Sequence, residues 1–369
     1  MSLTLDACLA AIDDAGLSKA SIDGLAGRPS GWSEIDGFSG PRVADVQDAM
    51  RLDLNWVSSG PAGNGQLQGV IEACAAVAMG FAEHVLVYRS VSESSTRATS
   101  VELVNGAGPE RVADNLQWLL PFGARSGISW LAMFARRHMH EFGTTREQLG
   151  HIALNARRNA TINPTAVYRS PLSMGDYLGS RMVSSPLCLY DCDVPVDGAV
   201  AFVLSRREYA AYAPHGVAHV NAIGSGLHGR PLWDQWHDMT TMAASGAARA
   251  LWNRTELRPD DVDVAELYDG SSVLTMFWLE ALGFCGRGES GAFVEGGERI
   301  ALGGVLPLNT AGGQLSAGRL HGHGLLHEAC LQLRGQAATH QVQGSPEVAL
   351  VSAGGGPAAA CMLLTSHEG

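Results

Sequence analysis

The second part of this chain repeats the pattern of its first part, and this repeat limits the folds that are possible. Matching residues occur at one constant offset: Ala7, Ile12, Leu17, Ile22 and Asp23 correspond to Ala247, Trp252, Leu257, Val262 and Asp263. Each part then has a glycine-rich loop that leads into a helical pattern containing Glu-Ala-Cys, at 72–74 and at 328–330. An apolar segment typical of a buried strand follows, at 85–89 and at 348–352. The repeat predicts two similar α/β units packed together.

The repeat divides the chain into two predicted halves, 1–210 and 211–369. In the first half, residues 3–15 and 67–79 carry apolar side chains at helical spacing, and residues 84–89 form a nearly continuous apolar run. A helix followed by a buried strand is the pattern of a sheet whose faces are covered by helices. The predicted fold class is therefore α/β, with one sheet in each half.

Residues 101–185 interrupt the α/β pattern of the first half. This segment is richer in Trp, Arg, Asn and His, and helical patterns occur at 130–142 and after a capping box that begins at Thr145. We predict a mostly helical insertion, of the kind that often forms a lid or a docking surface. Its His138 and His140 lie beside two arginines and are predicted to belong to a solvated face.

Composition excludes several classes of protein. The chain has 369 residues, of which 46% are hydrophobic, so it can bury a large core. Its net charge of -12 argues against a nucleic-acid-binding face, which needs clustered Lys and Arg. No apolar run is long enough to span a bilayer, and Met1–Gly16 lacks the regions of a signal peptide. Most of the seven cysteines lie within apolar periodic segments, as reduced core cysteines do, so a cytoplasmic location is expected.

Two kinds of chemistry lack the residues that they need. Lys19 is the only lysine, and it lies in a polar turn after a helix-terminating glycine. A Schiff-base enzyme needs a desolvated lysine in a pocket, so this chemistry is not expected. Cys188 and Cys192 have no second pair of ligands to complete a zinc site, and no metal is expected.

The segment 306–330 combines a glycine-rich loop with the start of a helix. Arg319, His321 and His323 lie close together in the loop, and an apolar helical pattern follows. Glycines let a backbone approach a ligand closely, and the N-terminus of a helix directs N–H groups and a positive dipole end toward the preceding loop. Such a loop suits a developing oxyanion. The alternative is a tight surface loop with solvated histidines, and a second polar loop, after the predicted strand 262–267, favours the first interpretation.

Four segments carry a resemblance to the thiolase superfamily. They are MVSSPLCLYDCDVPVDGAV at 182–200, ELYDGSSVLTMFWLEALGFC at 266–285, the loop in 306–330 and the triple glycine at 354–356. The chain is most similar to the branch of thiolase-like sterol-carrier and lipid-transfer proteins, over nearly its whole length. The resemblance implies a thiolase fold, with two duplicated halves in five αβαβα layers. Relative to that family the chain starts on a helix and lacks the first strand, so we expect a shortened N-terminus or a misplaced start.

The chain departs from true thiolases at each catalytic cysteine. The loop that holds the nucleophile in thiolases reads PAGNGQ here, at 61–66. The nearest cysteine, Cys74, lies two turns into the next helix, where a core position is expected. The second thiolase cysteine falls on Ala353, and the histidine of the Gly-His-Pro motif is replaced by Arg319. Without a nucleophile no acyl-enzyme forms, which excludes thiolysis and Claisen condensation by the usual route.

Tyr268 and Asp269 follow the predicted strand 262–267, where thiolase relatives carry an Asn-Glu or a His-Asp pair facing the reacting carbons. The resemblance assigns Tyr268 as general base or proton relay, tuned by a neighbouring histidine. It makes His321 or His323 the partner acid or base. Asp269 is expected to orient the loop or a histidine. The alternatives are a capped core tyrosine and an aspartate that forms a turn or caps a helix.

Backbone and cationic groups complete the predicted site. The N–H groups of Gly354, Gly355 and Gly356 are expected to offer an oxyanion site. Arg319 is expected to bind the thioester region or the phosphates of coenzyme A. The well-understood aldolases of this branch carry a second tyrosine in the loop of Arg319, and this chain does not.

Relatives without the nucleophilic cysteine include retro-aldolases, which cleave a β-hydroxyacyl-CoA, such as a steroid side-chain intermediate, into a ketone or aldehyde and a smaller acyl-CoA. The resemblance implies this carbon–carbon lyase activity, with coenzyme A as part of the substrate and no separate cofactor. It also implies a homodimer and a small partner of the DUF35 type, with an OB-fold and a zinc ribbon. The alternative is a module that binds lipid or acyl-CoA without turnover, or a structural subunit of a thiolase/DUF35 complex.

Overall fold

The computed structural model describes residues 1–27, 37–59, 66–96, 120–124, 126–227, 233 and 236–368. The helices are α1 (Ser2–Asp14), α2 (Val43–Met50), α3 (Gln68–Ala78), α6 (Gly127–Phe142), α7 (Arg146–Ile162), α8 (Met174–Gly179), α9 (Ala244–Trp252), α10 (Ser272–Ala281), α11 (Ser290–Val294) and α12 (His323–Leu333). The strands are β1 (Gly24–Gly27), β2 (Trp56–Ser58), β3 (His84–Ser92), β4 (Met182–Ser184), β5 (Leu187–Cys188), β6 (Asp197–Ser205), β7 (His219–Leu227), β8 (Val264–Glu266), β9 (Val348–Gly354) and β10 (Ala358–Thr365).

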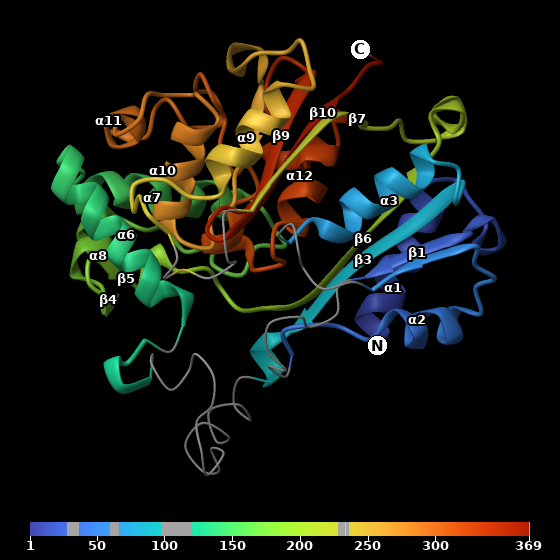
Figure 1. Ribbon diagram of the computed structural model, residues 1–369. Coiled ribbons are helices and arrows are strands. Elements are labelled where there is room, and N and C mark those ends of the chain that lie inside the picture. The colour runs from blue at the N-terminus through green and yellow to red at the C-terminus, as the bar shows by residue number, and fades with distance from the viewer. Residues whose placement is uncertain are drawn as a thin grey trace.

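Two four-stranded sheets of closely related topology form the framework (Figure 1). The first has the order β2-β1-β3-β6 and the second has the order β7-β10-β9-β8. In each sheet a parallel pair, β1 with β3 or β8 with β9, is continued by an antiparallel strand, β6 or β10. The register repeats as well, since Ser205 lies opposite His84 and Thr365 lies opposite Val348. The duplication predicted from the sequence is confirmed.

A repeated aspartate joins the two strands of a parallel pair in each sheet, β1 and β3 in the first and β8 and β9 in the second. Asp23 Oδ1 accepts the backbone N–H of His84 at 2.9 Å, and Asp263 Oδ2 accepts that of Val348 at 2.9 Å. Asp23 also accepts the backbone N–H of Glu83 at 3.0 Å, and Asp263 accepts that of Glu347 at 2.8 Å. These carboxylates satisfy N–H groups at the point where the next strand begins. The match of the two aspartates in sequence therefore has a structural cause.

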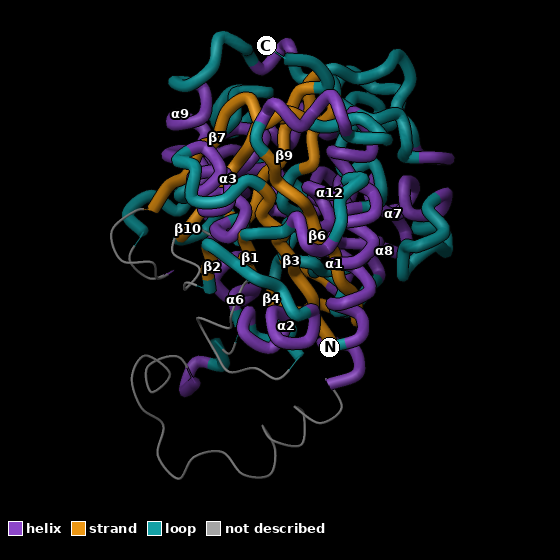
Figure 2. The backbone as a smooth tube through the Cα atoms, turned by 90° about the vertical axis from the view of Figure 1, so that its right-hand side faces the viewer, coloured by secondary structure: helices purple, strands orange, loops and turns teal. Residues whose placement is uncertain are grey.

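Helices cover both faces of each sheet, in five layers. α3 contacts β1 and β3, while α12 contacts β8 and β9 and also reaches β6, so these two helices lie between the sheets. α1 and α2 cover the outer face of the first sheet, and α9 covers that of the second (Figure 2). The β9 and β10 segments read as continuous apolar runs because helices bury both of their faces. None of the described helices has the length and apolar character needed to cross a bilayer.

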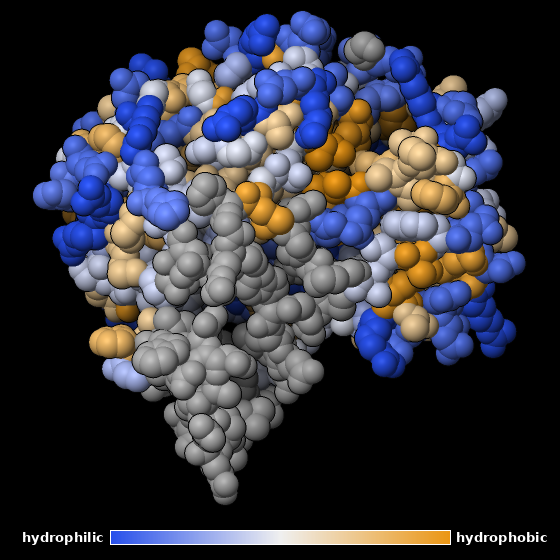
Figure 3. Space-filling model, in the orientation of Figure 1, coloured by the Kyte–Doolittle hydropathy of each residue, from blue (hydrophilic) through white to orange (hydrophobic). Residues whose placement is uncertain are grey.

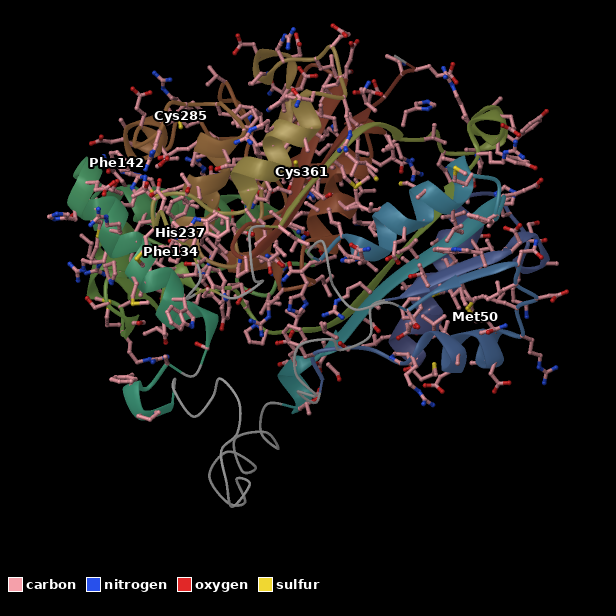
Figure 4. All side chains as sticks on the ribbon, viewed as in Figure 1. Met50, Phe134, Phe142, His237, Cys285 and Cys361 are labelled. Carbon is pink, nitrogen blue, oxygen red and sulfur yellow. The ribbon has the colours of Figure 1, made fainter. Side chains whose placement is uncertain are left out.

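The seven cysteines are all free. Burial raises the pKa of every one of these thiols, including Cys8 at the centre of the smaller core and Cys361 on β10. Figure 4 shows that Cys361 lies far from Met50, which belongs to the smaller core under the first sheet. Cys74, the cysteine nearest to the nucleophile position of thiolases, has its pKa raised to about 12. A thiol with a raised pKa is a poor nucleophile at neutral pH, so Cys74 does not replace the missing one.

The helical insertion packs on the second half of the molecule, although it belongs to the first half in sequence. α7 contacts α10 and α11, and α6 contacts α10 (Figure 1). The predicted capping box is present, with Thr145 Oγ1 accepting the backbone N–H of Gln148 at 3.2 Å. Residues 101–119 of the predicted insertion lie outside the described residues.

The prediction of a solvated face is right for His140 and wrong for His138. His140 is exposed, whereas His138 is buried and its two ring nitrogens contact Thr144 Oγ1 at 2.7 Å and Glu280 Oε1 at 2.9 Å. Glu280 comes from α10, so the histidine joins the insertion to the second half. The periodicity of α6 could not reveal a polar partner so far away in sequence.

Candidate active site

The turn after β8 is held by side chains from two neighbouring segments. The backbone N–H of Tyr268 donates to Ser352 Oγ on β9 at 2.8 Å. The Asn309 side chain accepts the N–H of Leu267 at 2.7 Å and donates to its carbonyl at 2.9 Å. Because parallel strands end at the same edge of a sheet, residues after β8 and near the end of β9 meet here. Tyr268 and its neighbour Asp269 are both buried.

Asp269 fixes the loop that precedes α12. Its Oδ1 accepts the backbone N–H of Gln314 at 2.8 Å, and its Oδ2 accepts that of Leu315 at 3.3 Å. Burial raises the pKa of Asp269 to about 7, and these two N–H donors act in the opposite direction. Gly313 has a φ of 56° and lies against the carboxylate, so a Cβ at this position would collide with Asp269 Oδ2. The contacts favour the orienting role that was expected for Asp269.

The Tyr268 phenol lies among charged and amide groups. Burial, followed by the negative charge of Asp193, raises the pKa of Tyr268 to about 12, while hydrogen bonds from Gln66 and Gln314 and the positive charge of Arg319 oppose the shift. Tyr268 is therefore a neutral phenol at pH 7, and it can take a proton from a substrate only as it passes its own proton on. After burial, the charges of Asp193 and Arg319 and the hydrogen bonds from the two glutamines have the largest influence on this pKa. The expected tuning by a histidine stays a prediction.

Arg319 neutralises two carboxylates beside this phenol. Its Nη1 donates to Asp193 Oδ1 at 2.8 Å, and its Nε and Nη2 donate to the two oxygens of Glu93, with an Nε–Oε1 distance of 3.3 Å. Burial raises the pKa of Asp193 to about 6, and the guanidinium opposes that shift. A guanidinium fork suits such paired acceptors. These carboxylates engage the guanidinium, and the coenzyme A contact expected for Arg319 stays a prediction.

His321 and His323 flank Gly322, the residue that caps the N-terminus of α12, and both have contacts on the first sheet. His321 Nδ1 lies 2.7 Å from an Arg89 nitrogen on β3, and its Nε2 lies 3.7 Å from Glu93 Oε1. The His323 ring lies 6.3 Å from the Phe202 ring on β6. Glu93 is thus shared between His321 and the arginine beside Tyr268. The structure joins His321 to the phenol through a chain of charged groups.

Gly322, between the two histidines, packs against Tyr268 and Ala353. It caps α12 with a φ of 83°, and a Cβ on it would lie 2.7 Å from Ala353 Cβ and 3.7 Å from Tyr268 Cδ2. Its N–H donates to Gln314 Oε1 at 3.2 Å. By the resemblance to thiolases, Ala353 falls on the position of the second cysteine, and Gly322 lies beside both Ala353 and the Tyr268 ring. The positive end of the α12 dipole starts at the same point.

The triple glycine forms the turn from β9 to β10. Gly354 and Gly355 have φ values of 72° and 125°. The Gly355 N–H donates to the carbonyl of Ala358 at 3.1 Å, so this donor is used within the turn and not for an oxyanion. Gly356 lies against the Trp233 ring, with no room for a Cβ. The expectation of an oxyanion site is therefore wrong for the Gly355 N–H. For the N–H groups of Gly354 and Gly356 it stays a prediction.

Three polar residues at this site were not predicted from the sequence. Asp193 lies inside the 182–200 motif and Gln314 inside the 306–330 loop, but neither was singled out. Glu93 directly follows β3, where a polar residue after a buried strand is the signal that could have found it. In the described part of the chain, no cluster of three His, Cys, Asp or Glu side chains could hold a metal ion. Residues 61–65 of the predicted nucleophile loop lie outside the described residues.

This geometry defines a thiolase-type fold whose site offers a phenol, carboxylates and an arginine in place of thiols. A family model described as Thiolase C-terminal domain-like matches residues 226–365. The chain is 34% identical to a steroid side-chain-cleaving aldolase of Thermomonospora curvata, over 99% of this chain and 92% of that protein. It is 33% identical to a 17-hydroxy-3-oxo-4-pregnene-20-carboxyl-CoA lyase of Mycobacterium tuberculosis, over 99% of this chain and 94% of that protein.

Solved structures agree with these relatives. The Ltp2-ChsH2(DUF35) aldolase superposes with a TM-score of 0.86 and 33% identity, over 99% of this chain and 92% of that chain. A monomeric SCP2-thiolase-like protein of Mycobacterium smegmatis, at 17% identity and a TM-score of 0.70, shares the fold. The chain belongs to the thiolase superfamily. Within it, the chain belongs to the thiolase-like lipid-transfer branch that contains these aldolases.

Proposed function

We propose that this protein is a carbon–carbon lyase that cleaves a β-hydroxyacyl-CoA carrying a steroid or similar bulky group. The observation that carries the proposal is the buried Tyr268 phenol, whose ring lies beside Gly322 at the start of α12. Two relatives that match almost the whole chain are named for cleaving a steroid side chain and for lyase activity on a steroid CoA thioester. A site that exchanges protons and has no nucleophile suits a retro-aldol reaction.

The reaction needs one proton removed and one returned. Loss of the β-hydroxyl proton lets the oxygen form a carbonyl while the bond between the α and β carbons breaks. Its electron pair enters the enolate of the thioester, and the α carbon then takes a proton. In our proposal Tyr268 accepts the hydroxyl proton while passing its own to Asp193, and Arg319 keeps the carboxylates charged. Such an acid–base group contributes about 10²- to 10⁴-fold to a rate.

The remaining predicted groups keep supporting roles. His321 or His323 supplies or relays the proton to the α carbon, and Asp269 holds the loop between them and Tyr268. The N–H groups of Gly354 and Gly356 are the backbone donors proposed for the enolate oxygen. Coenzyme A enters as part of the substrate, and we propose no separate cofactor, because a thioester is itself the electron sink.

We also propose a homodimer and a DUF35-type partner, in the cytoplasm. The solved relative is a complex with a DUF35 protein, which supports the proposal of a DUF35-type partner.

The feature that supports the homodimer is a groove beside the outer strand β2, lined by Trp56, Val57, Glu72, Met79 and Phe81. Val57, Met79 and Phe81 are 53%, 72% and 60% exposed, and Figure 3 shows hydrophobic side chains at the surface over α3. Exposed apolar side chains beside a sheet edge are typical of an interface between subunits.

The test is turnover of 17-hydroxy-3-oxo-4-pregnene-20-carboxyl-CoA by the purified protein, with and without a DUF35 partner. We expect a 17-ketosteroid and a shorter acyl-CoA, detected by mass spectrometry. Tyr268→Phe should lower kcat by about 10²-fold or more and leave binding of the CoA ester unchanged. Binding without any ketone in either sample would instead support a non-catalytic acyl-CoA module, and an unchanged rate in Tyr268→Phe would remove Tyr268 from the mechanism.

A further inference from the structure

Glu266 and Glu328 lie together behind the turn that carries Tyr268. Glu266 is the last residue of β8, and Glu328 comes from α12, which packs against β8 and β9 (Figure 1). Glu266 is fully buried and Glu328 is 3% exposed. Among the described residues, His340 is the one basic side chain within ion-pair distance of either carboxyl group, with its Nε2 3.2 Å from Glu328 Oε2. The proposed lyase mechanism uses neither glutamate.

The Thr310 hydroxyl group bridges the two glutamates and reveals a proton. Its Oγ1 lies 2.7 Å from Glu266 Oε1, 2.6 Å from Glu328 Oε1 and 3.0 Å from Gln332 Nε2. A hydroxyl group has one hydrogen to donate, and an amide nitrogen can only donate to it. Thr310 therefore donates to one carboxyl oxygen, and the second short contact between oxygens needs a proton on the other glutamate. The geometry thus requires one proton on this pair.

The contacts of the two carboxyl groups place this proton on Glu266. Both oxygens of Glu328 have a partner besides Thr310: Gln332 Nε2 donates to Oε1 at 2.8 Å, and His340 lies beside Oε2. Glu266 Oε2 is buried and has no hydrogen-bond partner in the part of the chain that the structure describes. An unpartnered oxygen costs more on a buried carboxylate than on a neutral carboxyl group. Burial, followed by the negative charge of Glu328, raises the pKa of Glu266 well above its ordinary range, in agreement with this placement.

Thr310 and its neighbour Asn309 join this pair to the start of the Tyr268 turn. Thr310 donates its backbone N–H to Glu266 Oε1 at 2.9 Å. The Asn309 side chain binds both the N–H and the carbonyl of Leu267, the residue before Tyr268. A change in the charge of Glu266 therefore acts on the contacts that position the phenol.

The groups that face Glu266 from the neighbouring elements are negative or neutral. β9 carries no titratable side chain, and α7 presents the amides of Asn155 and Asn159 to the carbonyl groups beside β8. α12 presents Glu328, and the turn after β8 carries Asp269, whose charge also raises the pKa of Glu266. Ionisation of Glu266 would add a second negative charge beside Glu328, and two like charges in one buried site strongly disfavour each other.

We propose that Glu266 and Glu328 share a single proton through Thr310 and that this proton positions the Tyr268 turn. With the proton in place, Glu266 is neutral and Thr310 and Asn309 keep their contacts. As the pH rises the proton passes to solvent, the two carboxylates repel each other across Thr310, and the turn loses its position. Both glutamates are positioning residues, because they act through Thr310 and Asn309 and not on the substrate. The inference rests on the proposed function in taking Tyr268 as the acid–base group.

The experiment titrates the full-length protein with alkali and follows two kinds of NMR signal, from isotope-labelled glutamate carboxyl groups and from isotope-labelled tyrosine rings. The Glu266 signal is assigned by its absence in Glu266→Gln, and the Tyr268 signal by its absence in Tyr268→Phe. We expect Glu266 to hold its proton well above the ordinary range of a glutamate and to lose it as the pH rises further. The Tyr268 signal should shift with the same midpoint, apart from the ionisation of the phenol itself, whose pKa is about 12.

Two variants should move both midpoints, in opposite directions. Glu328→Gln removes the neighbouring negative charge and should lower them by about one pH unit or more. Thr310→Val removes a hydrogen bond that favours the charged form of Glu266 and should raise them. Glu256→Gln removes the same charge from an exposed position and is the matched control, with no change expected.

Three results would overturn the proposal. A Glu266 carboxyl group that titrates in the ordinary range would show that the pair holds no proton. Midpoints that Glu328→Gln leaves unchanged would show that the proton is not shared, and a Tyr268 signal that does not follow Glu266 would show that the pair does not position the turn. The titration of the wild type is decisive even where a variant does not fold. None of these signals depends on lyase activity, so a failure of this proposal is distinguishable from a failure of the proposed function.

Discussion

Arg319 and Asp193 are joined by a 2.8 Å hydrogen bond beside the buried phenol of Tyr268. By the resemblance to thiolases, the arginine falls on the position of a histidine and Ala353 on that of a cysteine. The negative charge of Asp193 raises the pKa of Tyr268, and the positive charge of Arg319 opposes that shift. This network can be tested apart from turnover.

Arg319→Met should destabilise the fold, because it leaves Glu93 and Asp193 without their shared cation. Removal of one partner from a buried ion pair typically costs about 3–5 kcal/mol, so we expect the free energy of unfolding to fall by about that amount. A triple variant that combines Arg319→Met with Glu93→Gln and Asp193→Asn buries no unpaired charge. It should recover most of the lost free energy of unfolding. Urea unfolding followed by circular dichroism compares the three proteins. A single variant as stable as the wild type would show that the network is solvated.

Asp193→Asn should lower the pKa of Tyr268. The negative charge of Asp193 is, after burial, the largest influence that raises this pKa to about 12. Ultraviolet titration of tyrosinate, taken as the difference between each protein and its Tyr268→Phe form, isolates this one phenol. Asp197→Asn, which removes an exposed charge on β6, is the matched control and should leave the titration unchanged. Equal curves for the two variants would place Asp193 too far away to act on the phenol.

The pH dependence of stability should reveal the buried carboxyl of Asp269. Its pKa rises from an ordinary 3.8 to about 7 on folding, so between these values the folded state holds a proton that the unfolded state has released. Stability contributed by this group is therefore present at low pH and is lost as the pH rises to about 7. The free energy of unfolding of the wild type, minus that of Asp269→Asn, should fall by a few kcal/mol from about pH 4 to pH 7. A difference that stays constant with pH would contradict the raised pKa.

Local patterns predicted the framework, and long-range partners decided the site. Asp23 and Asp263 match in the sequence repeat because each one binds the backbone N–H at the start of the equivalent strand, β3 or β9. Such repetition is visible in the sequence. His138 and Arg319 look like solvated or ligand-binding groups from their neighbours alone. Their actual partners, Glu280 for His138 and two carboxylates for Arg319, come from segments far away in the chain. No periodicity carries that information, since it depends on which loops the fold brings together.

Gly322→Ala should disturb the site through one contact that a second substitution can relieve. The new Cβ would lie 2.7 Å from Ala353 Cβ, and a φ of 83° adds a cost of about 1–2 kcal/mol for a residue other than glycine. Ala353→Gly in the same chain removes the steric clash but leaves the backbone cost. The double variant should therefore lose less free energy of unfolding than the two single variants lose together. Urea unfolding of the wild type, the two single variants and the double variant gives the interaction energy, expected at about 0.5–3 kcal/mol.

The Cβ that Gly322→Ala adds would also lie 3.7 Å from Tyr268 Cδ2. Turnover should therefore fall in Gly322→Ala and recover in part in the double variant. Strict additivity of the two changes in stability would mean that residues 322 and 353 do not touch.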